Sequence, residues 1–166
     1  MNKKQTQSNG FSLVELMVTL AILMLIAGLA LAYGTAGLAR LRVEIASRRV
    51  LLGLEQGRSA AVRSGRPCAL HLGETGWSAP PNSSMHPCTG VDIPLVEGIE
   101  NTLVEVDHNL PDTVRFTSNG LILDGGTIVL RSDGTDLVRC VVMSLPLGIT
   151  RVGRMESGIC QKDPSL

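Results

Sequence analysis

The longest uncharged stretch of the chain lies near its start and limits what the protein can fold into. After Glu15 the next charged residue is Arg40, and the 24 residues between them are dense in Leu, Ala, Ile and Met. About 20 such residues suffice to cross a bilayer as a helix. Because a carboxylate in the middle of a membrane costs roughly 2.5–3.5 kcal/mol on insertion scales, we expect Glu15 to lie near the headgroups or to be paired.

The length of 166 residues leaves room for one further domain of about 100–130 residues, within the usual single-domain range. Only four aromatic residues occur, so its core must be built from Val, Leu and Ile: Phe11, Tyr33, Trp77 and Phe116. Gly and Pro fall mostly beyond residue 65, which favours strands and turns there. We therefore expect an α+β fold, with a long N-terminal helix, half of it transmembrane, packed on an antiparallel β-sheet head.

Charge is unevenly distributed although the net charge is zero. Residues 40–66 hold seven arginines against two glutamates, whereas residues 67–166 hold twelve acidic residues against five arginines and Lys162. A basic segment beside an acidic head favours charge-complementary packing between copies or partners. It is unlike a nucleic-acid-binding domain, which is usually basic as a whole.

Four cysteines follow the apolar segment: Cys68, Cys88, Cys140 and Cys160. They form no C-x-x-C pair, so thioredoxin-like redox chemistry has no support. A membrane or export segment ahead of them favours an oxidising compartment, and hence disulfides. Of the three pairings, the sequential one closes two loops of about 20 residues, each worth on the order of 3 kcal/mol. We favour it because it would join adjacent strands or pin a loop, but the other two stay open.

Metal binding is a weaker interpretation of two clusters. A zinc site would use Cys68, His71, His86 and Cys88, but this cysteine spacing is unlike that of ordinary zinc motifs. The run from 133 to 136 has too few oxygen ligands for calcium and is typical of a turn. No phosphate loop, nucleophile elbow or metalloprotease helix occurs, so we expect neither an enzyme nor a bound cofactor.

The helical pattern continues beyond the apolar segment with two apolar stripes. The first stripe ends in residues with small side chains, which suits close packing on the domain's own sheet. It consists of Ala36, Val43, Val50, Leu54, Gly57 and Ala61. The second lies on roughly the opposite side and is free to meet another subunit: Leu38, Leu41, Ile45 and Leu52. Gly65 and Pro67 then end the helix. Gly28, Gly34 and Gly37 weaken its middle and favour a bend or partial melting.

The remaining chain is predicted to form strands at 68–72, 76–78, 91–95, 102–106, 113–117, 120–123, 127–131, 137–144 and 149–154. Asp133-Gly134 marks a hairpin turn between the strands at 127–131 and 137–144. Residues 79–90 are rich in Pro and form a loop that a Cys68–Cys88 bridge would pin.

Two interpretations of the N-terminus differ in where the mature chain starts. Lys3 and Lys4 would hold the first residues in the cytoplasm and place the head outside. In a secretory signal, cleavage after Ala32 would release a domain beginning at Tyr33, such as a secreted enzyme. The apolar run is longer than a typical signal core and has Glu15 in its opening, which favours retention of the segment.

The stretch Gly10-Phe11-Ser12-Leu13-Val14-Glu15, followed by the apolar helix, resembles the class III signal of type IV pilins and type II secretion pseudopilins. This resemblance implies cleavage between Gly10 and Phe11 by the prepilin peptidase and N-methylation of Phe11. It also implies that the helix inserts into a filament. There a neighbour's Glu15 would neutralise the new amine of Phe11, because an unpaired charge in an apolar bundle is costly.

The remainder resembles the GspH/FimT family, which includes minor pilins and the minor pseudopilin GspH. The resemblance rests on residues 54–65, on 114–120, and on 139–144 followed by Gly153-Arg154 and Cys160. It implies a pilin-like fold with a leader at 1–10, a transmembrane and filament-core helix at 11–37, an amphipathic helix at 38–66 and a β-rich head at 67–166. Implied partners are other pilins or pseudopilins, the prepilin peptidase and the inner-membrane assembly platform.

The resemblance implies a minor pilin or pseudopilin that spans the inner membrane once, with its head in the periplasm, and then joins or primes a type IV pilus. One alternative is a GspH-like minor pseudopilin of a type II secretion system. Another is a DNA-binding FimT-like pilin, with contacts from Arg151, Arg154 and Lys162. The Gly-Arg-x-Arg motif of those pilins is replaced here by Gly-Arg-Met-Glu at 153–156, and the carboxylate weakens phosphate attraction. Nucleic acid is therefore the less favoured partner.

Overall fold

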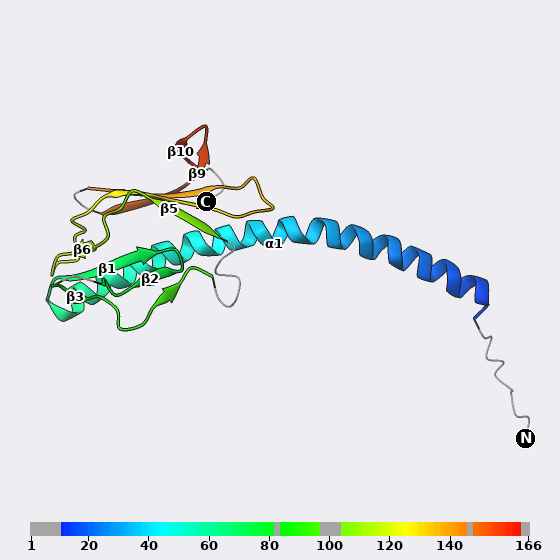
Figure 1. The fold of residues 1–166 in the computed structure, drawn as a ribbon, viewed down its shortest axis with the longest axis horizontal. Coiled ribbons are helices and arrows are strands. Elements are labelled where there is room, and N and C mark those ends of the chain that lie inside the picture. Colours follow the sequence, from blue (N-terminus) through cyan, green and yellow to red (C-terminus); the bar gives the residue numbers. More distant parts are fainter. Residues whose placement is uncertain (1–10, 82–83, 97–103, 146–147, 164–166) are drawn as a thin grey trace, which may run out of the picture. The chain divides into compact units, whose positions relative to one another are not determined.

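A computed structural model describes residues 11–81, 84–96, 104–145 and 148–163. The expected leader, with Lys3, Lys4 and Gly10, lies outside these residues. The chain divides into two compact units, residues 1–36 and residues 37–166. One helix, α1 (Leu13–Ser64), contributes to both units, and the ten strands within the described residues all belong to the second (Figure 1).

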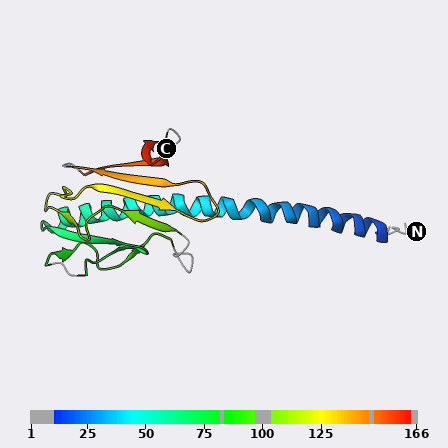
Figure 2. The same ribbon diagram turned by 45° about the horizontal axis from the view of Figure 1, so that its top comes forward.

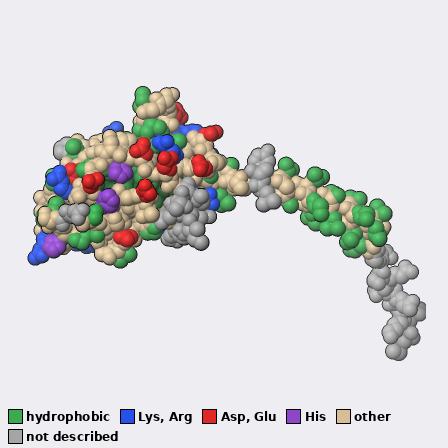
Figure 3. Space-filling model, in the orientation of Figure 1, with side chains coloured by type: hydrophobic (Ala, Val, Ile, Leu, Met, Phe, Trp, Pro, Cys, Tyr) green, Lys and Arg blue, Asp and Glu red, His purple; other side chains and the backbone are tan. Residues whose placement is uncertain are grey.

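The first unit contains the apolar half of α1. The chain stays helical through Gly28, Gly34 and Gly37, so the expected local melting is not present. Hydrophobic side chains predominate among the coloured side chains of this half (Figure 3), and most of the large ones are more than half exposed. Within the described residues, α1 is the one helix long and apolar enough to cross a membrane. Its apolar surface therefore needs a cover of lipid or protein.

The head contains two sheets. In the first, the strand order is β3-β1-β2-β4, and β6 pairs with residues 68–70 of β1, at the end of β1 that also pairs with β3. Its strands are β1 (Cys68–Gly73), β2 (Gly76–Ser78), β3 (His86–Pro87), β4 (Ile93–Pro94) and β6 (Val114–Phe116). All pairs are antiparallel except β1 with β3, which is a short parallel pair.

The second sheet is antiparallel throughout, with the strand order β10-β9-β8-β7-β5. Its strands are β5 (Glu105–His108), β7 (Gly126–Arg131), β8 (Arg139–Ser144), β9 (Ile149–Glu156) and β10 (Ile159–Lys162). The predicted turn at Asp133-Gly134 lies between β7 and β8, and Gly134 has a φ of 87°. Within the head, one sheet lies on each side of the helix (Figures 1 and 2).

Most predicted strands are present with shifted ends, but the one at 120–123 is wrong, and the first two residues of the one at 102–106 lie outside the described residues. The backbone there makes a tight turn: the N–H of Gly120 donates to the carbonyl of Thr117, and the Thr117 hydroxyl accepts from Leu121. Gly120 has a φ of 75°, which a strand does not use. Ile122 makes an isolated bridge to Phe116. The short strands β3 and β10 were not predicted.

The first predicted stripe of α1 forms the core against both sheets. Val43, Val50, Leu54 and Ala61 are buried together with residues from β1, β6, β7 and β8, and partly buried Val152 of β9 packs against this cluster. Ala36 is exposed, so its assignment to this stripe is wrong; it precedes the head unit, and burial of α1 begins at Ala39. The helix ends at Ser64, and Gly65 follows with a φ of 63°, as its predicted capping role requires.

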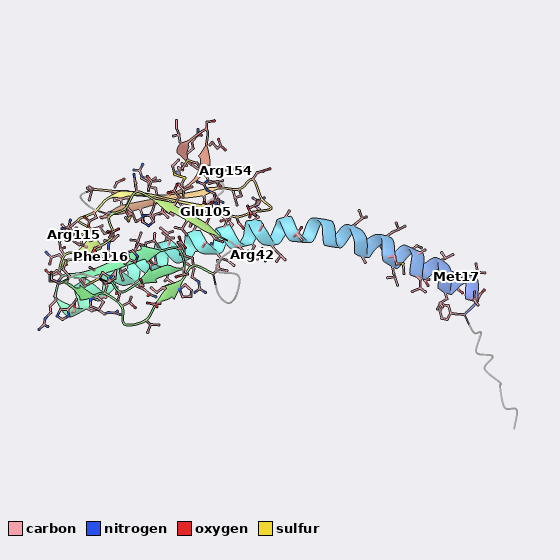
Figure 4. All side chains as sticks on the ribbon, in the orientation of Figure 1. Met17, Arg42, Glu105, Arg115, Phe116 and Arg154 are labelled. Carbon is pink, nitrogen blue, oxygen red and sulfur yellow. A yellow bond between two sulfur atoms is a disulfide. The ribbon has the colours of Figure 1, made fainter. Side chains whose placement is uncertain are left out.

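Glycines allow α1 to approach the first sheet closely. The indole of Trp77 is fully buried, and its Nε1–H donates to the carbonyl of Val50 at 3.1 Å. A side chain on Gly53 would overlap this indole ring. A side chain on Gly57 would come within 2.7 Å of the Phe116 ring. Phe116 is buried, whereas Arg115, the preceding residue of β6, points outward (Figure 4).

We predict that Gly53→Ala destabilises the head by about 1–3 kcal/mol, because overpacking outweighs the better helix propensity of alanine. Gly37→Ala is the matched control, since nothing lies within 4 Å of the added methyl group. It should gain up to about 1 kcal/mol. Urea unfolding of the full chain in detergent measures both changes, and equal stability of the two variants would contradict this packing.

Candidate functional site

Glu15 lies in the first turn of α1, where a negative side chain interacts favourably with the positive end of the helix dipole. Its side chain is exposed, and within the described residues it has no ion-pair partner. Phe11, the expected first residue after cleavage, is also exposed. The structure thus presents a carboxylate at the start of an uncovered apolar helix.

The second predicted stripe is exposed on the head half of α1. Its members are 37–53% exposed, and they are Leu38, Leu41, Ile45 and Leu52. The opposite stripe is buried from Val43 to Ala61. A shallow groove lies between α1 and residues 88–90, and on the helix side its lining includes Leu52 and Arg63. The apolar stripe and this groove form a continuous surface suited to another protein chain.

A buried ion cluster joins the helix to the C-terminal segment, and it was not predicted. Arg139 on β8 is only 3% exposed and donates to Glu44 of α1 and to Asp163, which follows β10. Burial opposes the charge of Arg139, but its hydrogen bonds to Glu44 and Asp163 outweigh burial and raise the pKa of the guanidinium. The cluster therefore fixes three parts of the head far apart in sequence.

A second ion pair lies at the edge of the first sheet. Arg115 donates from Nη2 and Nε to the two carboxylate oxygens of Asp124, at 2.7 and 3.0 Å, and its backbone N–H adds a third bond at 2.9 Å. The Asp124 side chain is 9% exposed. These hydrogen bonds lower the pKa of Asp124, against the opposing effect of its burial.

We predict that this pair gives the head a pH-dependent stability. Since the folded-state pKa of Asp124 is lowered, the pair stabilises the fold above the ordinary aspartate pKa of about 3.9. That stabilisation is lost as the pH falls through the lower, folded-state pKa. The free energy of unfolding should therefore fall more steeply below about pH 4 in the native chain than in Asp124→Asn. Parallel pH profiles would contradict this.

The three candidate DNA contacts do not lie together. Arg151 and Lys162 both line one groove on the second sheet. Arg154 is on the opposite face of β9, with its Nε 3.9 Å from a carboxylate oxygen of Glu156 (Figure 4). The structure thus brings two of the three predicted cations together.

Two disulfides join the cysteines in the sequential pairing that we favoured. Cys68–Cys88 ties β1 to the residue after β3, and Cys140–Cys160 ties β8 to β10 across β9. Cys68 and Cys88 are therefore not available as zinc ligands. Among the described residues, no group of three or more His, Cys, Asp or Glu side chains is placed to hold a metal ion.

Two family models match the chain. The model of the prokaryotic N-terminal methylation motif matches residues 6–31, which include Gly10, Phe11 and Glu15. The model described as type II transport protein GspH matches residues 46–146, more than half of the chain. The chain belongs to the GspH family. Searches of curated proteins and of solved structures gave no significant match.

This GspH-family chain is a pilin- or pseudopilin-type subunit with a membrane-anchoring apolar helix. The family match includes the C-terminal end of the second stripe, the first sheet and strands β5, β7 and β8. It ends before β9 and β10, so Arg151, Arg154 and Lys162 lie beyond it. The candidate cations are therefore features of this chain rather than of the matched region.

Proposed function

We propose that this GspH-family chain is a minor subunit of a type IV pilus. It enters the inner membrane with its head in the periplasm, loses residues 1–10 to the prepilin peptidase and is methylated on Phe11. Residues 11–37 then pass from lipid into the filament core, residues 38–66 join this core to the head, and residues 67–166 form the exposed head.

The observation that carries this proposal is the uncovered apolar surface of α1. Lipid covers the first half of the helix before assembly, and the same side chains pack equally well against the helices of neighbouring subunits. The exposed stripe from Leu38 to Leu52 extends that contact surface into the head. A helix requires a partner when its own domain leaves one of its apolar sides uncovered.

Glu15 supplies the specificity that an apolar surface lacks. Cleavage after Gly10 creates a cationic amine on Phe11, four residues before Glu15 in the same chain. In a bundle of such helices, an incoming amine is stabilised where it meets the carboxylate of a neighbour, because either charge alone is costly in an apolar medium. The pair thereby fixes the register of adjacent subunits, as buried polar residues do in coiled coils.

A second candidate function is that of a minor pseudopilin in a type II secretion system, which the description of the matching family model favours. The two disulfides and the arginine-rich helix favour the pilus. DNA capture is supported by two cations in one groove and is disfavoured by the acidic head. In all three cases the chain acts by assembly and binding rather than by catalysis.

Deletion of the gene, followed by complementation, distinguishes a subunit of a type IV pilus from a subunit of a type II secretion system. We expect the deletion to remove surface pili, to leave protein secretion intact, and to be complemented by the native chain. Lost secretion with normal pili would overturn the pilus proposal in favour of the pseudopilin. Complementation with Arg154→Ala should be normal, because this residue has no assigned role in assembly.

A further inference from the structure

A groove on the outer face of the second sheet holds two exposed cations. Arg151 of β9 and Lys162 of β10 both line it, together with the half-buried Val142 of β8. The register pairs Lys162 with Gly153, two residues along β9 from Arg151, so the two cations are diagonal neighbours on one face, about 7–8 Å apart. The groove has a volume of about 710 Å³, which is enough for several side chains of another molecule.

Two local features form one wall of this groove by holding β10 above the sheet. The carbonyl oxygen of Gln161 lies where the side chain of any other residue at Gly153 would begin, so only glycine allows β10 to cross β9 this closely. The Cys140–Cys160 disulfide crosses β9 at the same point, with the sulfur of Cys160 3.1 Å from that position. Figure 1 shows β10 rising out of the plane of the longer strands. The fold therefore shapes the groove before any partner binds.

The net charge of the groove is positive. The one acidic residue in its described lining, Asp163, has a side chain only 14% exposed and is bound to the buried guanidinium of Arg139. Within the described part of the chain, neither Arg151 nor Lys162 is paired with a carboxylate. Two positive charges are therefore available to a partner.

Apolar side chains lie beside the cations on the same face. The register sets Val142 opposite Arg151, and in the next row of this face it sets Ser144 opposite Ile149. The side chain of Ile149 is 49% exposed. An occupant that brings both carboxylates and apolar side chains fits this whole surface, because ion pairing at the cations and burial of Val142 and Ile149 then both stabilise the complex.

We propose that this groove binds an acidic segment of a different subunit of the same filament. Charge complementarity selects carboxylates, and the apolar side chains select a protein over DNA, whose phosphates would leave Val142 and Ile149 uncovered. The head as a whole is acidic and repels the many phosphates of DNA more strongly than one short segment. This inference rests on the proposed function as a minor filament subunit and gives the chemistry of one of its partners.

A second copy of this chain fits the groove less well than a different subunit. The carboxylates of Glu105 and Asp107, on the edge strand β5, lie on the same outer face as Arg151 and Lys162. Two copies that meet through this face form a closed two-fold pair, which does not extend a filament. A minor subunit also has few neighbours of its own kind, so the partner is a different chain.

The test uses the fact that Lys162 is the sole lysine after Gly10. Filaments sheared from the native host are treated with a carbodiimide, which joins an amine to a carboxylate in contact with it without adding a spacer. Digestion and mass spectrometry then identify the peptide joined to Lys162. We expect a peptide from a different pilin or pseudopilin subunit, joined through Asp or Glu, in an amount that falls as salt rises during the reaction.

Three variants check that the groove itself makes the contact. Lys162→Arg keeps the charge and removes the amine, so the chain should stay in filaments without the adduct. Arg151→Glu keeps the amine but repels the carboxylate, so the adduct should fall about ten-fold. The matched control is Arg154→Glu, which makes the same charge change on the opposite face of β9 and should leave the adduct unchanged.

Four results would overturn the proposal. If Lys162 is joined only to carboxylates of its own chain or of a second copy, the partner is not a different subunit. If the adduct appears only after nuclease treatment, DNA occupies the groove. If filaments that contain the cleaved chain give no adduct, this contact is rejected and the filament role stands. If the cleaved chain is absent from filaments, the proposed function is rejected as well.

Discussion

Replacing Glu15 with alanine is expected to leave the chain in the membrane and to remove it from the filament. The apolar segment after Glu15 is long enough to anchor the helix without the carboxylate, and its cleavage site is unchanged. In the filament, however, the substitution leaves a neighbour's Phe11 amine without its counter-charge. Breaking one member of a buried ion pair costs about 3–5 kcal/mol, so incorporation should fall by more than about 100-fold.

The measurement compares the amount of chain in sheared filaments with the amount in the inner membrane. Glu15→Gln keeps the size and removes the charge, so it should be lost from filaments as completely as Glu15→Ala. Glu74→Ala is a control because Glu74 is exposed on the turn between β1 and β2. Normal incorporation of either Glu15 variant would show that the carboxylate is not what recruits the subunit.

Arg139→Met is expected to have the largest effect on the stability of the head. It leaves the carboxylates of Glu44 and Asp163 without the guanidinium that neutralises both of them. Removing one partner from such a buried cluster costs about 3–5 kcal/mol. Trp77, the sole tryptophan and fully buried, allows the unfolding of the full chain in urea to be followed by fluorescence.

Two comparisons separate lost charge from lost packing. Arg131→Met removes an exposed arginine whose ion pairs are 3.6–3.8 Å long, and it should cost less than about 1 kcal/mol. Combining Arg139→Met with Glu44→Gln and Asp163→Asn should recover part of the loss, because no charge is then left buried. A triple variant no more stable than Arg139→Met would mean that the loss comes from the packing of the methionine and not from the uncompensated carboxylates.

Features that depend on neighbouring residues could be predicted from the sequence. The long helix, its end at Gly65 and its two stripes follow from local spacing, because side chains three or four residues apart share a face. The long strands of the second sheet and the turn at Asp133-Gly134 follow from alternation and from turn chemistry. The motif around Gly10 and Glu15 is equally local, so the order of its residues alone is enough to indicate the family.

Features that depend on register or on distant contacts could not be predicted in the same way. Arg139 and Glu44 are 95 residues apart, and only the packing of β8 against α1 brings them together. One signal was present: Arg139 lies two residues from both Leu137 and Val141, which places it on the same face as these apolar side chains. The position of Lys162 on the same face as Arg151 likewise follows from the pairing of β9 with β10.

The mass of the N-terminal peptide of the mature chain tests the central claim most directly. The chain is recovered from the inner membrane and from sheared filaments of the native host, and both samples are digested and analysed by mass spectrometry. The account predicts a peptide beginning at methylated Phe11 in both fractions. A chain that begins at Tyr33, or one that retains Met1 to Gly10 in assembled filaments, would contradict it.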